Sequence, residues 1–132
     1  MTSHHRTVRP LVVVSSLAPG GAERVTVSFL RRLKSAGHDV PVCTVSSQQD
    51  GALAEELRQA GVARYDLAAR RLADARALLR LIRLIRGERY DLVHAHGQDA
   101  AILAALACAV CGVPFVATRH VLEEPVEKMP TR

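Results

Sequence analysis

Aromatic residues are scarce in this chain of 132 residues, which has no tryptophan, two tyrosines and two phenylalanines. The net charge is +5, but proteins that bind nucleic acids usually interleave basic side chains with aromatic rings on which bases stack. Here Phe29, Tyr65, Tyr90 and Phe115 each lie inside or beside an apolar pattern. This arrangement is typical of core residues, so we do not expect nucleic acid as a partner.

Cysteine is also scarce, and the odd number of three argues against a disulfide framework. Cys43, Cys108 and Cys111 all lie in apolar segments. The Cys108-x-x-Cys111 spacing has no second cysteine pair that would complete a tetrahedral zinc site. We therefore interpret the cysteines as small buried side chains and expect no metal.

Long apolar runs are missing, since none approaches the ~18 residues of a membrane-spanning helix. The segment 1–6 lacks the apolar core and the cleavage site of a secretory signal. We expect a cytoplasmic protein in which residues 1–8 form a disordered tail. A chain of this length is expected to form one domain and to bury roughly two-thirds of its unfolded surface.

Apolar runs bounded by turn residues alternate with helical patterns over residues 9–120. Strands are expected at residues 9–15, 39–45, 62–67, 90–95 and 114–118, and helices at residues 22–35, 52–60, 72–86 and 98–110. Repeated strand–helix units force parallel strands with right-handed crossovers. The pattern predicts an α/β fold, a doubly wound Rossmann-like parallel sheet of five strands in the order 3-2-1-4-5, flanked by helices.

Two of the predicted helices have marked faces. In helix 22–35, Val25, Phe29 and Leu33 share one apolar face. Helix 72–86 carries arginines at positions 76, 80 and 83 opposite its apolar side. Such a row is either a surface for a membrane or a partner, or the solvated side of a covering helix, which is the commoner case. Peripheral membrane association therefore stays open as an alternative.

The carboxyl ends of parallel strands form one rim of a sheet, and ligands collect there near the switch between the first and fourth strands. The residues that follow the strands on this rim are Gly20 and Gly21, then His96 and Gly97, then Arg119 and His120. Paired glycines let the backbone pass a ligand closely and take up positive φ, and the next helix directs free N–H groups toward an anion. The alternative is a tight turn that needs glycine only for its geometry.

The histidines differ in what their positions suggest. His120 ends a buried strand, where a large polar group has little structural purpose, so a functional role is favoured. His96 is either a functional group or a loop residue that turns the chain into the next helix. His94 points inward in the alternation of its strand, and we expect a core histidine.

Several nucleotide sites are excluded by spacing. No Gly-Lys-Ser/Thr follows the first strand, and no G-x-G-x-x-G occurs, so the usual triphosphate and dinucleotide motifs are missing. The second strand ends in Val45-Ser46-Ser47, without an acidic residue for the ribose of NAD.

Four segments together resemble the N-terminal, acceptor-side domain of family 4 (group 1) retaining glycosyltransferases. They are Leu-Ala-Pro-Gly-Gly-Ala-Glu-Arg at 17–24, Ala-Gly-His-Asp-Val at 36–40, Tyr-Asp-Leu-Val-His-Ala-His-Gly at 90–97 and Pro-Phe-Val-Ala-Thr-Arg-His at 114–120. The resemblance implies GT-B architecture, with two facing Rossmann-like domains. Residues 9–120 would be the first of these, and residues 121–132 a truncated loop or tail.

The resemblance also implies an activity. Such enzymes move a sugar from a nucleotide-sugar donor to an acceptor hydroxyl with retention, and they usually need no metal or other cofactor. By resemblance His120 is the catalytic residue near the transferred sugar. Gly20 and Gly21 would approach a diphosphate or an acceptor phosphate, and His96, Gly97 and Arg119 would bind substrate.

The family members are usually more than twice as long, and nothing here matches their nucleotide-gripping second domain. We therefore expect this chain to be inactive alone and to associate with itself through the fifth strand or helix 98–110. The alternative is a stand-alone flavodoxin-like module that binds a phosphorylated ligand or regulates, without chemistry. The sequence does not name the sugar, the nucleotide or the acceptor.

Overall fold

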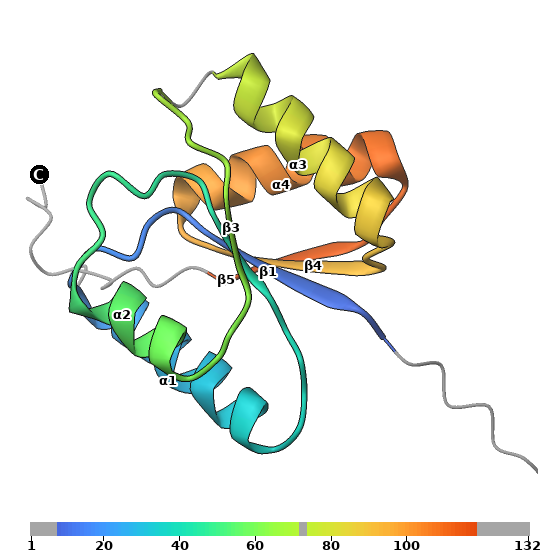
Figure 1. Ribbon diagram of the computed structural model, residues 1–132. Coiled ribbons are helices and arrows are strands. Elements are labelled where there is room, and N and C mark those ends of the chain that lie inside the picture. The colour runs from blue at the N-terminus through green and yellow to red at the C-terminus, as the bar shows by residue number, and fades with distance from the viewer. Residues whose placement is uncertain (1–7, 72–73, 119–132) are drawn as a thin grey trace, which may run out of the picture.

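Figure 1 shows the computed structural model of the chain, which describes residues 8–71 and 74–118. Strands and helices alternate throughout this part. The elements are β1 (Pro10–Val14), α1 (Gly21–Ser35), β2 (Val42–Thr44), α2 (Ala52–Gln59), β3 (Arg64–Asp66), α3 (Ala75–Glu88), β4 (Leu92–His96), α4 (Gln98–Cys111) and β5 (Phe115–Thr118). The predicted tails at 1–8 and 121–132 lie outside the described residues, apart from Val8.

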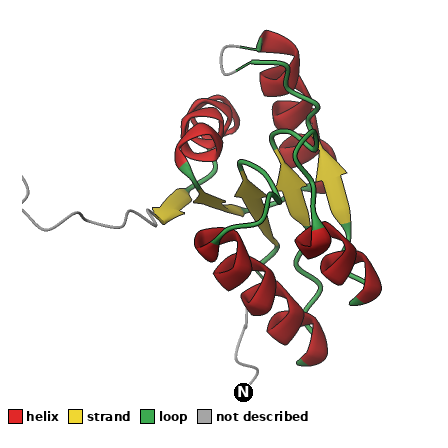
Figure 2. Cartoon of the chain, turned by 90° about the vertical axis from the view of Figure 1, so that its left-hand side faces the viewer, coloured by secondary structure: helices red, strands yellow, loops and turns green. Residues whose placement is uncertain are grey.

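The strands form one five-stranded parallel sheet in the order β3-β2-β1-β4-β5, which confirms the predicted doubly wound fold. Helices cover both faces of the sheet (Figure 2). The direction of winding reverses between β1 and β4, because α1 and α2 lead outward to β2 and β3 whereas α3 returns the chain to β4. The carboxyl ends of β1 and β4 therefore flank the switch point.

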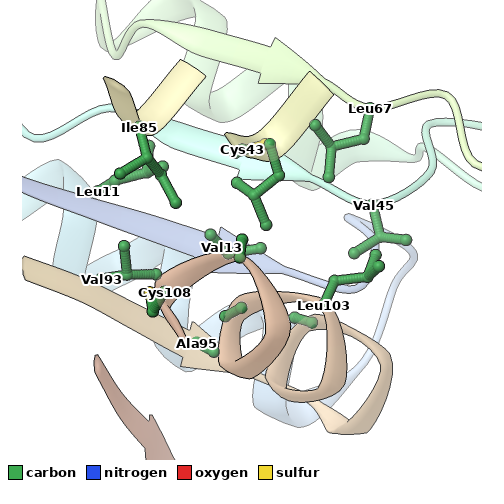
Figure 3. Packing of buried hydrophobic residues seen from close by; sticks show 14 of the residues in the cluster. Leu11, Val13, Cys43, Val45, Leu67, Ile85, Val93, Ala95, Leu103 and Cys108 are labelled. Carbon is green, nitrogen blue, oxygen red and sulfur yellow. The ribbon is translucent and has the colours of Figure 1, made fainter. Parts of the chain in front are cut away.

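The central strand β1 is buried on both faces, which accounts for its unbroken apolar run. Leu11 and Val13 contribute to the core beneath α3 and α4 (Figure 3). Val12 and Val14 belong to a second cluster with side chains of α1 and α2. Position along β1 thus decides which helical layer each residue contacts.

The apolar face predicted for the first helix is wrong. Val25 and Phe29 of α1 are 57% and 45% exposed, whereas Thr26, Val27 and Leu30 are buried. The sequence offered two apolar stripes at helical spacing, and the stripe with a threonine packs on the sheet. Its hydroxyl donates a hydrogen bond to the Ala22 carbonyl at 3.1 Å, so a polar residue is buried without an unpaired group.

Helix α3 begins at Ala75, three residues later than predicted, because Asp74 caps it. The Asp74 carboxylate accepts hydrogen bonds from the backbone N–H groups of Arg70 and Arg76, both at 3.0 Å. The N–H of Arg70, more than that of Arg76, holds the pKa of Asp74 below its usual value. All three arginines of the row are exposed, and Arg80 also donates a hydrogen bond to the Leu67 carbonyl at 2.6 Å.

Two of the three cysteines are buried, as predicted. Cys43 and Cys108 are buried and Cys111 is half-buried. Burial raises the pKa of Cys43 to about 12 and that of Cys108 to about 11. These thiols are therefore protonated at neutral pH and inert. None of the helices among residues 8–71 and 74–118 has the length and apolar character needed to cross a bilayer.

Candidate functional site

A cavity of about 650 Å³ opens at the carboxyl ends of β1, β4 and β5. The loop after β1, the first turns of α1 and one side of α4 line it, together with His96, Gly97 and the end of β5. A second cavity of about 660 Å³ lies at the opposite end of the sheet, near Pro10 and Tyr90. We take the first as the candidate site, because doubly wound sheets bind ligands at the carboxyl ends of their strands.

Gly20 and Gly21 form the start of α1 at the margin of this cavity, although neither residue lines it. Gly20 has φ −179° and ψ 165°, an extended conformation that any residue adopts, and Gly21 does not have positive φ. The expected positive φ at this turn is therefore wrong. The two glycines differ in their surroundings, since a Cβ atom on Gly21 would meet open space whereas one on Gly20 would collide with the Glu23 carboxylate.

In the cavity wall, Gly97 has a backbone conformation that favours glycine. Its φ is 98°, and a Cβ atom there would lie 2.5 Å from the Ser15 Oγ. Ser15 Oγ in turn accepts a hydrogen bond from the Ala100 N–H at 3.2 Å, and the Ser15 N–H donates to the His96 carbonyl at 3.3 Å. The loop after β1 is thereby joined to the first turn of α4. Sequence reasoning missed Ser15, whose only signal is its place after a buried strand.

The two histidines of β4 lie on one face of the sheet, as residues two apart in a strand must. Their ring centroids are 4.1 Å apart and the rings are tilted by 39°. His94 Nε2 lies 2.6 Å from Thr118 Oγ1, which joins β4 to the end of β5 and agrees with a structural histidine. His96 lines the cavity. Arg119 and His120 follow Thr118 directly but lie outside the described residues.

Glu23 is a cavity residue that sequence reasoning missed. It is the third residue of α1, where glutamate commonly supports a helix start, so the sequence carries no separate signal. The side chain is half-buried and folds back over Gly20. Neighbouring arginines do not pair with it, because Arg24 and Arg31 contact Glu56 at 3.1 and 3.0 Å.

Acidic residues near the tip of β2 are engaged by the protein itself. Arg64 holds Asp50 in a two-pronged ion pair, with N–O distances of 2.6 and 2.9 Å. Asp66 accepts hydrogen bonds from Thr44 and Ser47 at 2.8 and 2.7 Å. Within the described part of the chain, no three histidine, cysteine, aspartate or glutamate side chains are grouped as a metal site requires.

Sequence comparison identifies related proteins. The model of the family described as Glycosyltransferase Family 4 matches residues 19–132. A curated relative, the UDP-Gal:alpha-D-GlcNAc-diphosphoundecaprenol alpha-1,3-galactosyltransferase of Escherichia coli, is 26% identical over 117 residues. The match covers 88% of this chain and 30% of the relative.

Solved structures share the fold. The chain matches Anabaena HepE in complex with UDP at a TM-score of 0.70 and a glycosyltransferase of Rickettsia africae at 0.67, each at 21% identity. Each match covers 92% of this chain and 32% of the solved chain. The chain therefore spans about a third of the length of the relatives that it matches.

Proposed function

Because this chain belongs to glycosyltransferase family 4, we propose that it forms the N-terminal, Rossmann-like half of a cytoplasmic GT-B enzyme that transfers a sugar with retention. The donor is a nucleotide-activated sugar and the acceptor is a hydroxyl group. The Escherichia coli relative takes its sugar from UDP-Gal, and the Anabaena structure contains UDP. We therefore propose UDP as the nucleotide.

The observation that carries this proposal is the cavity at the switch point, beside the N-terminal ends of α1 and α4. Gly20 precedes α1 and has no side chain that could cap it. The first N–H groups of that helix therefore receive no hydrogen bond from a capping side chain at this position. The open space at Gly21 leaves room for a diphosphate, whose developing charge these N–H groups would stabilise.

The remaining roles belong to the same proposal. His96 and Gly97 contribute the wall of the acceptor side. His120 would act near the transferred sugar and Arg119 would bind substrate. The missing domain would supply the donor-binding half, so the chain alone transfers no sugar. Peripheral association with a membrane that carries the acceptor would use the exposed arginines of α3.

The test is sugar transfer by the protein that the native gene produces, isolated with an antibody against this chain. We expect it to release UDP from UDP-glucose, UDP-galactose or UDP-N-acetylglucosamine when a lipid extract of the source cells is added, whereas the 132-residue chain releases none. In the native protein, His120→Ala should lower the rate by roughly 100-fold or more, while His38→Ala, at the far end of the sheet, should leave it unchanged.

The competing interpretation makes a different prediction. A native protein no larger than this chain, which saturates with a phosphorylated ligand and transfers nothing, would identify a stand-alone flavodoxin-like module and end the transferase proposal.

A further inference from the structure

Glu23, a residue of the cavity wall, has an uncommitted carboxylate at the margin of the candidate cavity. Its side chain is half-buried and lines the cavity, yet among the residues that the structure describes it accepts no hydrogen bond and forms no ion pair. The three heavy atoms nearest to a Cβ built on Gly20 all belong to this carboxyl group. The carboxylate therefore lies over Gly20, at the margin of the cavity, in space that a side chain at position 20 would occupy.

Other polar side chains around the cavity are already used by the fold. Thr26 donates to the Ala22 carbonyl, Ser15 accepts from the Ala100 N–H, and Thr118 contacts His94. The side chain of Gln98, at the first turn of α4, has no hydrogen-bond partner among the described residues. The groups left for a ligand thus include a carboxylate and an amide.

The rest of the lining restricts the ligand further. Ala101, Ile102 and Ala105 give the cavity an apolar wall along α4. Within the described lining no lysine or arginine is present, and Glu23 supplies the negative charge. A free phosphate would meet repulsion from this carboxylate, and none of the described lining residues carries a fixed positive charge to offset it. A neutral ring with hydroxyl groups would donate hydrogen bonds to Glu23 and place its C–H surface on the α4 wall.

We propose that the cavity binds a neutral sugar ring and that Glu23 selects it, accepting hydrogen bonds from its hydroxyls and excluding phosphate. The inference rests on the proposed function and specifies its acceptor side: the acceptor's sugar occupies the cavity, and the donor diphosphate stays on the open side of Gly21. Glu23 is a specificity-determining residue and not the catalytic one. A glutamate that only supports the start of α1 would affect stability but not the choice of ligand.

The test is an NMR titration of the 132-residue chain that follows the backbone amides of Ala101, Ile102 and Ala105. The probes are glucose, galactose, mannose and N-acetylglucosamine on one side and inorganic pyrophosphate on the other. We expect at least one neutral sugar to shift these amides in the wild-type chain. Glu23→Gln should lower the affinity for that sugar about fivefold, because hydrogen bonds to a charged acceptor are stronger than those to an amide.

Pyrophosphate should respond in the opposite direction. Its affinity at these amides should rise roughly three- to tenfold in Glu23→Gln, because the substitution removes one negative charge beside the site. The matched control is Glu88→Gln, which makes the same charge change at the far end of α3, on an exposed side chain. It should alter neither titration.

Each of three results would overturn the inference. They are no binding by any of the four sugars, unchanged sugar binding in Glu23→Gln, and no gain in pyrophosphate affinity in that variant. Sugar transfer by the native protein is measured separately. Sugar binding that depends on Glu23, without any sugar transfer by the native protein, would refute the transferase proposal but keep the neutral-sugar site. Sugar transfer without such binding would refute the neutral-sugar site but keep the transferase proposal.

Discussion

Gly97 and Gly21 mark two different uses of glycine on one rim. Gly97 has φ 98° and faces the Ser15 side chain, so both its backbone conformation and its surroundings exclude a side chain. Gly21 has ordinary backbone dihedrals and open space around it. A side chain at Gly21 would therefore be tolerated by the fold and resisted only by a ligand.

This difference predicts the outcome of two alanine substitutions. Gly97→Ala should lower the free energy of unfolding by about 2–3 kcal/mol, since it forces a side chain into a glycine-only conformation and against Ser15. Gly21→Ala should change it by less than about 1 kcal/mol. Denaturant unfolding of the two variants measures both values. An equal loss of unfolding free energy in the two variants would show that the fold does not require glycine at position 97 more than at position 21.

The limits of sequence reasoning at this scale are seen in Glu23 and Ser15. The sequence places Ser15 at the end of a buried strand and Glu23 in the first turn of the next helix, but it marks neither as a site residue. It does not show that the Glu23 carboxylate turns back over Gly20 or that Ser15 reaches the first turn of α4. Those contacts depend on rotamers and on the packing of elements distant in sequence. His96 and Gly97 were predicted as site residues, and the structure places both in the cavity wall.

At the scale of elements, helix α1 shows what a periodic pattern leaves undecided. Strand order followed from the alternation of strands and helices, because right-handed crossovers leave few arrangements. The orientation of α1 about its own axis could not be predicted from this alternation, because residues 25, 29 and 33 form one helical stripe and residues 27 and 30 form another. The shape of the sheet decides which stripe of α1 packs against it. A short stretch of sequence does not specify that shape.

The buried stripe of α1 can be tested with a matched pair. Leu30→Ala should lower the free energy of unfolding by about 2–4 kcal/mol, because Leu30 is 1% exposed and its truncation leaves a cavity. Phe29→Ala removes a larger side chain that is 45% exposed, and it should cost less than about 1.5 kcal/mol. Chemical denaturation gives both values. A larger loss from Phe29→Ala would restore the face predicted from sequence.

The start of α3 should depend on pH through Asp74. Hydrogen bonds, the one from the Arg70 N–H first, hold the pKa of this carboxyl below 3.8 in the folded chain. A depressed folded-state pKa means that the capped form adds stability above the unfolded value and loses it as the pH falls through the folded value. Asp74→Ala should therefore be less stable than wild type at pH 6, with a difference that shrinks below pH 3.8.

Thermal unfolding of both chains across this pH range measures the effect. A difference that stayed constant down to the most acidic condition would mean that the carboxylate is not the capping group. Arg76→Ala serves as the control, since its backbone N–H remains available to Asp74.

At the scale of the whole molecule, the edge formed by β5 carries exposed apolar side chains. Phe115 and Val116 are 38% and 54% exposed, and β5 pairs with β4 alone among the described strands. An edge strand with unpaired backbone groups and apolar side chains readily pairs with another chain. The chain also spans about a third of its relatives, so elements that they possess are not represented in it.

We therefore expect the 132-residue chain to associate with itself through β5. Sedimentation velocity at rising concentration should show a shift from monomer toward dimer. Val116→Glu should weaken this association by tenfold or more, because pairing would bring two charges into an apolar contact, at a cost of about 1.4 kcal/mol or above. Leu79→Glu is the matched control: Leu79 is 51% exposed but lies on α3, away from this edge, and the substitution should leave the association unchanged. A chain that stays monomeric at every concentration, or a dimer that Leu79→Glu dissolves as readily as Val116→Glu, would place the contact elsewhere.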